Sequence, residues 1–342
     1  MTPFSTGFST GDAARVVAVD LGGTTARAAL VDRSGTVTAR LKEPVRHDAA
    51  HEQVADLMTR IAAGTDAVSA VVGLPGRVDH VEGRLHVARN LPSTDLGRLS
   101  AAHLSEVTGL AVELAGDAEL AAIGEAYFGA GSTAGTTAYL TLSTGIGAAV
   151  VSDGRVLSGR VSGFQIGFLH LLGAGRPMIE DLGSGQRVRE AGRELGRDVD
   201  YRALTDLASG DGAPGDTGTA PTAPHPHPHP HPHPHPRALA AAALTDIADA
   251  AASAALLLCH VVSPDVLVVG GGLARAAGAP LLDELDRRIR DTAGSHVSWD
   301  VDVRAAVCGD DAGLVGAGAW HLAQPIAVAT AADRLGMKGD RR

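Results

Sequence analysis

A glycine-rich turn beside one carboxylate is the first part of the chain that could do chemistry. The apolar run 16–19 ends in Asp20, and Gly22, Gly23 and Thr24 follow before a second apolar run opens. Glycines let a phosphate approach backbone N–H groups closely, hydroxyls donate to phosphate oxygens, and Asp20 can hold Mg²⁺ through water. The alternative is an ordinary tight turn between two strands.

A similar turn occurs in the middle of the chain. The apolar run 137–142 is followed by Thr144, Gly145 and Gly147, and the apolar run 148–152 comes next. Two strand–turn–strand units of this kind predict two lobes that grip one phosphate chain between them.

A single carboxylate follows another predicted strand. Asp117 lies between the predicted strand 111–114 and the predicted helix 119–128. Clefts of α/β proteins open at the carboxyl ends of strands, and a carboxylate there can orient a hydroxyl and accept its proton. The alternative is a helix N-cap, a position where Asp is preferred.

The elements that must position these residues alternate between strands and helices, which predicts an α/β fold. Strands are expected within 16–31 (two) and at 37–42, 67–72, 84–88, 111–114, 137–142, 148–152, 265–269 and 301–307. Helices are expected at 51–63, 99–108, 119–128, 238–262, 280–290 and 312–322. We predict an N-terminal lobe over 15–115, joined by a closing helix at 312–325, and a C-terminal lobe over 116–311.

Composition limits the classes of function. The chain has 342 residues, 45% of them hydrophobic, which supports about two domains, and its net charge of −10 argues against a nucleic-acid or anionic-membrane surface. Cys259 and Cys308 belong to no Cys-x-x-Cys pair, so neither a disulfide framework nor a thiolate zinc site is expected. No signal peptide is seen and no apolar run approaches the ~20 residues of a membrane span, so a cytoplasmic protein is expected.

Residues 209–236 differ in composition from the rest of the chain. They are rich in Gly, Pro, Thr and Ala and end in His-Pro repeated six times. Proline at every second position excludes helix and sheet, so we interpret this segment as a disordered insertion, and 1–14 and 330–342 as flexible tails. The histidines could bind Ni²⁺ or Zn²⁺; the alternative is a linker with adventitious metal affinity.

The order of the motifs resembles the ROK family of sugar kinases and sugar-responsive repressors, within the actin-like sugar kinase superfamily. The motifs are Asp-x-Gly-Gly-Thr at 20–24, Gly-x-Pro-Gly at 73–76, Asn-Leu-Pro at 90–92, Asp117, Thr-Gly-Ile-Gly at 144–147 and Gly-Gly-Gly at 270–272. The resemblance covers about residues 15–325 apart from the insertion. It implies a two-lobed, actin-like (ribonuclease H-like) ATPase fold with a cleft between the lobes.

The resemblance also implies roles for individual residues. The first phosphate motif is matched by Asp20, Gly22, Gly23 and Thr24, and the second by Thr144, Gly145 and Gly147. The adenosine motif is matched by Gly270, Gly271 and Gly272. Gly76 and Asn90 match the sugar side of the cleft, and Asp117 matches the general base. The implied cofactors are ATP and Mg²⁺, the implied partner is a small-molecule sugar, and a homodimer is the implied assembly.

The sequence departs from the family on the acceptor side. Where the family has Asn-Asp-Ala-Asn, this chain has Gly-Asp-Ala-Glu at 116–119, and Glu119 either meets a substrate group or is solvated in the first helical turn. The family motif Gly-Glu-x-Gly-His has two possible alignments here. One places Gln165 at the Glu position and Phe168 at the His position; the other keeps His170, as a ligand or a buried structural histidine.

Many relatives continue with a cysteine-rich zinc loop, and this chain has no cysteine there. The segment from Glu180 to Gly185 instead resembles the Glu-x-x-x-Ser-Gly of glucokinase-type relatives that lack zinc. Glu180 is then a sugar-contacting carboxylate, or alternatively part of the N-terminal cap region of a helix.

These observations favour an ATP-dependent sugar kinase with Asp117 as general base and an altered acceptor site. The alternative is a non-catalytic relative, a sugar or nucleotide sensor or scaffold with a degraded acceptor site. A repressor is disfavoured because about 15 residues precede the first strand, too few for a DNA-binding helix-turn-helix. The acceptor, and ATP or polyphosphate as donor, stay open.

Overall fold

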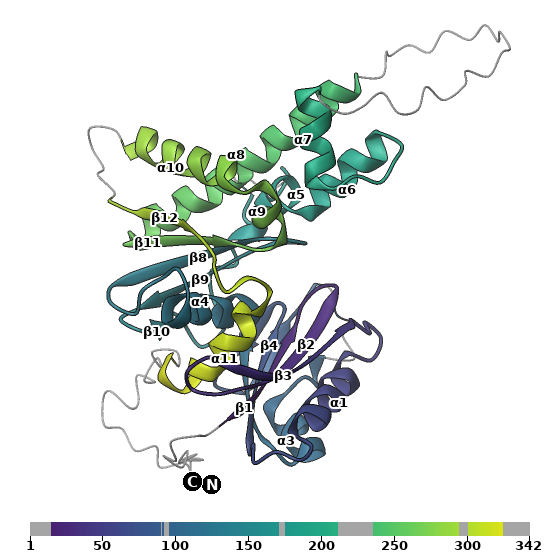
Figure 1. Cartoon of the computed structure of the whole chain (residues 1–342), viewed down its shortest axis with the longest axis vertical. Coiled ribbons are helices and arrows are strands. Elements are labelled where there is room, and N and C mark those ends of the chain that lie inside the picture. The colour runs from purple at the N-terminus through teal and green to yellow at the C-terminus, as the bar shows by residue number, and fades with distance from the viewer. Residues whose placement is uncertain are drawn as a thin grey trace, which may run out of the picture.

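The computed structural model describes residues 15–89, 91, 96–170, 175–210, 235–293 and 300–323. This part of the chain forms two five-stranded mixed sheets, with helices between them and on their outer faces (Figure 1). The predicted two-lobed α/β architecture is confirmed. The predicted tails, Asn90 and most of the predicted insertion lie outside the described residues.

The first sheet carries the first glycine turn. Its strand order is β3-β2-β1-β4-β7. The strands are β1 (Val16–Leu21), β2 (Thr25–Val31), β3 (Val37–Pro44), β4 (Ser69–Leu74) and β7 (Ala111–Gly116). β1 is antiparallel to β2 and parallel to β4, and β4 is parallel to β7. Helices α1 (Ala50–Ala62) and α3 (Ala101–Thr108) pack on this sheet, and the α1 residues at helical spacing, such as Val54 and Leu57, are fully buried.

The second sheet repeats the topology of the first. Its order is β10-β9-β8-β11-β12. The strands are β8 (Thr136–Leu142), β9 (Ile146–Ser152), β10 (Arg155–Val156), β11 (Val266–Gly270) and β12 (Asp302–Ala305). β8 is antiparallel to β9 and parallel to β11, as β1 is to β2 and β4. The two glycine turns therefore connect equivalent strands of the two sheets, as the repeated strand–turn–strand pattern predicted.

Several short elements escaped the sequence pattern. The strand predicted at 84–88 is β6 (Arg84–Val87), and it pairs in a small hairpin with β5 (Arg77–Asp79), which was not predicted. The second lobe also contains α5 (Ile179–Gly183), α6 (Gly185–Glu194), α7 (Tyr201–Ser209) and α9 (Gly272–Ala277). α7 ends and α8 (Pro236–Val262) begins at the borders of the predicted insertion, and Arg237 Nε donates to Ala208 O over 2.8 Å.

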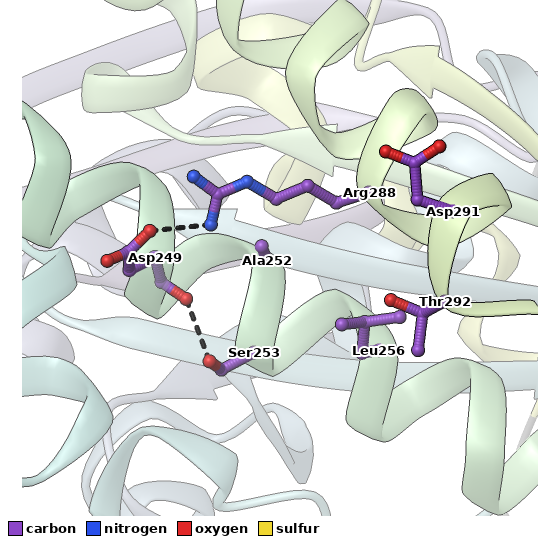
Figure 2. Close-up of a pocket in the computed structure, with 7 residues that line it drawn as sticks. All are labelled: Asp249, Ala252, Ser253, Leu256, Arg288, Asp291 and Thr292. Carbon is purple, nitrogen blue, oxygen red and sulfur yellow. Dashed lines mark hydrogen bonds and ion pairs between the residues drawn. The ribbon is translucent and has the colours of Figure 1, made fainter.

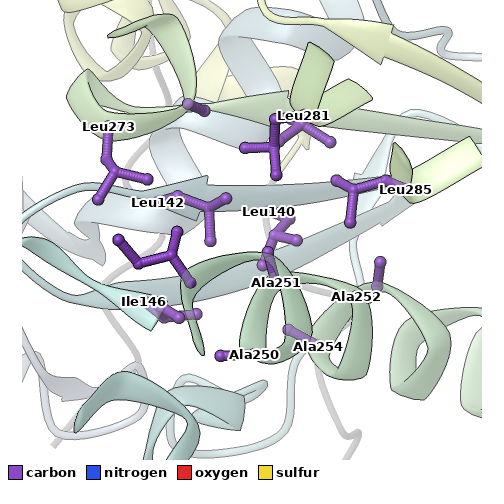
Figure 3. Close-up of a cluster of buried hydrophobic side chains, with 14 of the residues drawn as sticks. Leu140, Leu142, Ile146, Ala250, Ala251, Ala252, Ala254, Leu273, Leu281 and Leu285 are labelled. Carbon is purple, nitrogen blue, oxygen red and sulfur yellow. The ribbon is translucent and has the colours of Figure 1, made fainter. Parts of the chain in front are cut away.

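Helix α8 is the long Ala/Leu-rich helix expected from the sequence. Its alanines pack against Leu140 and Leu142 of β8 and Leu285 of α10 (Ala279–Ala293) (Figure 3). Among the described helices, α8 is the one that is long and apolar enough to cross a membrane. This finding corrects the expectation that no apolar run approaches the length of a membrane span. Half of its most apolar window is buried in the protein, and core helices pass the same test.

Helices α4 (Asp117–Phe128) and α11 (Ala312–Ala323) lie between the two sheets and contact both (Figure 1). Their backbones approach so closely that a Cβ on Gly316 would lie 1.9 Å from Leu120 O, and one on Gly124 would lie 2.2 Å from Ala312 O. Only glycine fits at such a crossing, so these two positions fix the packing of the helix pair that joins the sheets.

Candidate active site

A cleft of about 510 Å³ lies between the lobes and contains most of the predicted site residues. They are Asp20, Gly22, Gly23, Thr24, Gly76, Asp117, Thr144, Gly145, Gly147, Gln165, Glu180, Gly271 and Gly272. Both glycine turns thus face one cavity, together with the carboxylate predicted as the base.

Three predicted residues do not line this cleft. A Cβ on Gly270 would lie 2.6 Å from Tyr139 Oη, so this glycine serves close packing at the end of β11. His170 is exposed, which excludes the buried structural histidine, and its Nδ1 lies 2.5 Å from Arg176 O. Glu119 is 4% exposed and does not line the cleft, so the expectation that it is solvated is wrong.

The first turn is held by backbone hydrogen bonds, and its carboxylate has a cation beside it. Gly22 N donates to Thr25 O over 3.0 Å. The β1–β2 register places Arg27 directly opposite Asp20, and Arg27 Nη1 lies 3.1 Å from Asp20 Oδ2. Burial raises the pKa of Asp20, and the Arg27 charge acts in the opposite direction.

Arg27 continues into a chain of charges along the cleft. Its Nη2 lies 3.6 Å from Asp310 Oδ2, and Asp310 also accepts from Arg275 Nη1 over 2.7 Å. The hydrogen bond from Arg275 lowers the pKa of Asp310. Arg27 Nε is buried without a hydrogen-bond partner in the described part of the chain, so this guanidinium retains donor capacity beside the first glycine turn.

The second turn is organised by Glu180. Ile146 N donates to Glu180 Oε2 over 2.9 Å, and Ser143 N donates to Gly145 O over 2.9 Å. A Cβ on Gly145 would lie 2.4 Å from Glu180 Oε2, so the turn needs glycine where the carboxylate approaches. Glu180 lies in the first turn of α5, and its Oε1 is 3.4 Å from Arg89 Nη1 across the cleft.

Asp117 occupies the first residue of α4 rather than its cap. The N-cap is Gly116, in extended conformation, so the alternative of an Asp117 N-cap is wrong. Glu119 accepts from Gly116 N over 2.9 Å through Oε2, and its Oε1 lies 3.2 Å from His80 Nε2. Because Glu119 closes the helix terminus, the Asp117 side chain is left to the cleft.

The surroundings of Asp117 make it suitable as a base near neutral pH. Burial raises the pKa of Asp117 to about 7, and the charges of Asp20 and Glu119 also raise it. The 2.8 Å hydrogen bond from Ala118 N to Asp117 Oδ1 acts against this rise. A carboxyl with such a pKa, in a cleft beside two glycine turns, can accept a proton from a bound hydroxyl.

Magnesium with a nucleotide requires few protein ligands. In the described residues no group of three His, Cys, Asp or Glu side chains could hold a metal ion. Mg²⁺ commonly uses one or two carboxylates together with substrate phosphates and water, so a lone carboxylate at a phosphate turn is sufficient. Asp20 provides that donor, and it fits Mg²⁺ held through water.

Several cleft residues were missed from the sequence. They include Arg27, Arg77, Arg89, Tyr139, Arg189 and Asp310. A signal for Arg27 was present, since a hairpin around the Gly-Gly turn pairs it with Asp20. Arg77 and Arg89 directly adjoin Gly76 and Asn90, the positions matched to the sugar side.

A second hollow lies between α8 and α10 (Figure 2). It is lined by Asp249, Ala252, Ser253, Leu256, Arg288, Asp291 and Thr292. Arg288 Nη1 lies 2.6 Å from Asp249 Oδ1 there, so its cation is already neutralised. The hollow contains none of the residues predicted to act on a substrate.

Comparison with known proteins agrees with the motif order. The ROK family model matches residues 16–172 and 235–324. A glucokinase from Thermotoga maritima is 27% identical over 315 residues, covering 89% of this chain and 96% of the relative. The bifunctional enzyme NanE/NanK of Brucella melitensis is 30% identical over 313 residues, covering 88% of this chain and 52% of the relative.

Solved structures share the fold over the same extent. A ROK hexokinase from Thermus thermophilus has a TM-score of 0.68 at 28% identity, covering 89% of this chain and 96% of its own. A ROK family glucokinase from Streptomyces griseus, in complex with glucose and AMPPNP, has a TM-score of 0.71 at 23% identity, covering 90% and 99%.

Proposed function

This chain belongs to the ROK family, and from that premise we propose that it is an ATP-dependent sugar kinase with Asp117 as its general base. The observation that carries the proposal is the position of Asp117, with a pKa raised to about 7, in one cleft with both glycine turns. The glucokinase from Thermotoga maritima and the Streptomyces griseus enzyme bound to glucose and AMPPNP support a sugar acceptor and an ATP donor.

In the proposed reaction the two turns hold the triphosphate. Backbone N–H groups and hydroxyls of Gly22–Thr24 and Thr144–Gly147 bind its oxygens, and Gly271 and Gly272 leave room for the adenosine. Mg²⁺, held by Asp20 through water, would neutralise charge on the phosphates.

The chemical step is a single displacement at phosphorus. The acceptor hydroxyl oxygen forms a bond to the γ-phosphorus, and the bond from that phosphorus to the β–γ bridging oxygen breaks. The hydroxyl proton passes to Asp117, and ADP leaves. Asp117 thus orients the hydroxyl and receives the one proton that the reaction releases.

Release of ADP measures this function directly. The protein is incubated with Mg²⁺ and ATP and with hexoses, N-acetylated amino sugars and polyols. Polyphosphate replaces ATP in a parallel series, where the phosphorylated acceptor is measured because no ADP is formed. We expect acceptor-dependent turnover with ATP, and Asp117→Asn should lower kcat by about 10²- to 10⁴-fold. Asp206→Asn on the surface of α7 is the matched control. Nucleotide binding without turnover on any acceptor would contradict the proposal and favour the non-catalytic alternative.

A further inference from the structure

The part of the cleft around Gly76 differs in charge from the protein as a whole. We call it the acceptor end, defined by the cleft residues Gly76, Arg77, Arg89, Gln165 and Phe168. Two arginines line it in a chain whose net charge is −10. Gln165 and Phe168 add no charge, so the acceptor end is positively charged although the net charge of the whole chain is negative.

The hairpin β5–β6 brings the two arginines close together along the backbone. Arg77 pairs with Val87 in the register of this hairpin, and Arg89 follows two residues later. A Cβ on Gly76 would lie 2.2 Å from Val87 O, so the backbone before Arg77 packs directly on β6. The close approach brings the backbones of the two arginines near each other at this end of the cleft.

Arg77 has unused donors. Its Nε donates to Ser162 O over 3.2 Å, and this is the one hydrogen bond that the described residues give its side chain. A guanidinium has five N–H donors in a planar fork, which matches the geometry of a carboxylate or phosphate. The Nη groups of Arg77 are therefore available to a ligand in the cleft.

Arg89 is held weakly by its neighbours. Its Nη1 lies 3.4 Å from Glu180 Oε1, and its guanidinium carbon lies 5.1 Å from the centre of the Phe168 ring. Half of the Arg89 side chain is exposed, and exposed ion pairs contribute little free energy. Glu180 also accepts from Ile146 N, so it stays bound to the phosphate turn if Arg89 moves.

The nearby negative charges do not balance these cations. Glu180 neutralises one of them at most, and Asp117, with a pKa of about 7, is only partly ionised at neutral pH. A neutral sugar would leave a positive charge without a partner, whereas an anionic sugar supplies one.

We propose that the acceptor is an anionic sugar whose carboxylate or phosphate is bound by Arg77 and Arg89, while a free hydroxyl of the same molecule faces Asp117. The inference rests on the proposed function, since it identifies the acceptor of that reaction. Phe168 holds the Arg89 guanidinium from one side by a cation–π contact, which leaves its edge for the anion.

Binding in the presence of a non-hydrolysable nucleotide tests the inference without requiring turnover. Glucuronate, gluconate, glucose 6-phosphate and glucose are titrated by calorimetry into the protein with Mg²⁺ and AMPPNP. We expect at least one anion to bind on the order of tenfold tighter than glucose, with a preference that falls as salt rises. The carboxylates and the phosphate in the panel distinguish the two kinds of anion.

Variants locate the anion site. Arg77→Gln and Arg89→Gln should each weaken the preferred anion about tenfold and leave glucose binding within about twofold. Arg60→Gln on α1, whose partners are Glu43 and Asp56, is the control for loss of a surface arginine. Thermal stabilisation by AMPPNP, measured for every variant, shows that the cleft is folded.

The inference is overturned if glucose binds as tightly as every anion, or if both variants weaken glucose and the anion equally. If the protein phosphorylates neutral sugars but no anionic sugar, the inference is overturned and the kinase function stands. Preferential anion binding with no turnover on any member of the panel would remove the kinase function and the role of the anion as acceptor, and would leave only an anion-binding site at Arg77 and Arg89. Failure of all four compounds to bind overturns the inference as well.

Discussion

Arg27 Nη1 and Asp20 Oδ2 lie 3.1 Å apart, at directly opposed positions of β1 and β2. The pair places a cation and an anion side by side where the first glycine turn meets the cleft. Burial raises the pKa of Asp20 and Arg27 opposes that rise, so the arginine favours the ionised carboxylate that the proposed Mg²⁺ site requires.

Replacing Arg27 by Gln removes the positive charge that lowers the pKa of Asp20. We expect the KM for Mg²⁺–ATP to rise on the order of tenfold, because a more readily protonated Asp20 holds Mg²⁺ less well. Steady-state kinetics against the concentration of Mg²⁺–ATP measures the change. Arg40→Gln, which breaks the exposed pair with Asp311, is the control. An unchanged KM in both variants would show that Arg27 does not act on the nucleotide site.

The activity should follow the ionisation of Asp117. Since the base must be deprotonated, kcat/KM is expected to fall below about pH 7 and to level off above it. Glu119→Gln keeps an oxygen for the helix terminus and removes one charge that raises the pKa of Asp117, so the midpoint should move to lower pH. A midpoint that stays in place would mean that another group controls the acid limb.

Asp117 should also make folding depend on pH. Its pKa rises from an ordinary value of 3.8 to about 7 on folding, so between these values the folded protein holds a proton that the unfolded chain has lost. Stability should therefore fall as pH rises from about 4 to 7 and stay at the lower level above 7.

Asp117→Asn removes this dependence. We expect the variant to be more stable than the parent at pH 8 by about 2 kcal/mol, and the difference to shrink towards pH 5. Urea denaturation at the two pH values measures it, with Asp206→Asn as the control. Equal destabilisation at both pH values would show that the carboxylate makes contacts needed by the fold.

The crossing of α4 and α11 should tolerate no side chain. A Cβ on Gly316 would lie 1.9 Å from Leu120 O, so Gly316→Ala must push the helices apart. The substitution should lower the free energy of unfolding by about 1–3 kcal/mol. Gly97→Ala, where nothing lies within 4 Å of the added carbon, is the control. Denaturation midpoints of the two variants should differ, and equal midpoints would contradict the contact.

Local pattern was sufficient for the main elements of the fold. The apolar runs around Gly22 and Gly145 predicted the two hairpins, and the spacing of Val54, Leu57 and Ile61 predicted α1. The hairpin β5–β6 was not predicted as a pair, because its strands are short and its residue Asp79 is held by Arg160 of the other lobe.

The placement of both glycine turns at the cleft was predictable because the turns depend on backbone conformations that glycine encodes locally. The acceptor side was not, because its residues come from separate elements. His170 and Glu119 were matched by sequence position, yet one is exposed and the other closes a helix terminus. Arg89 meets Glu180 over 91 residues of chain, a contact that only the tertiary fold creates.

The hydrogen bond from Arg237 to Ala208 holds the end of α7 beside the start of α8, at the end of the second lobe remote from the first (Figure 1). The described residues that flank 211–234 are thus held close together, and the free energy of closing a loop between such ends grows only slowly with the length of the loop. This end of the second lobe is a natural place to graft a foreign domain whose own termini are close together. A fluorescent reporter placed there would leave the cleft, and both sheets that form it, without interruption.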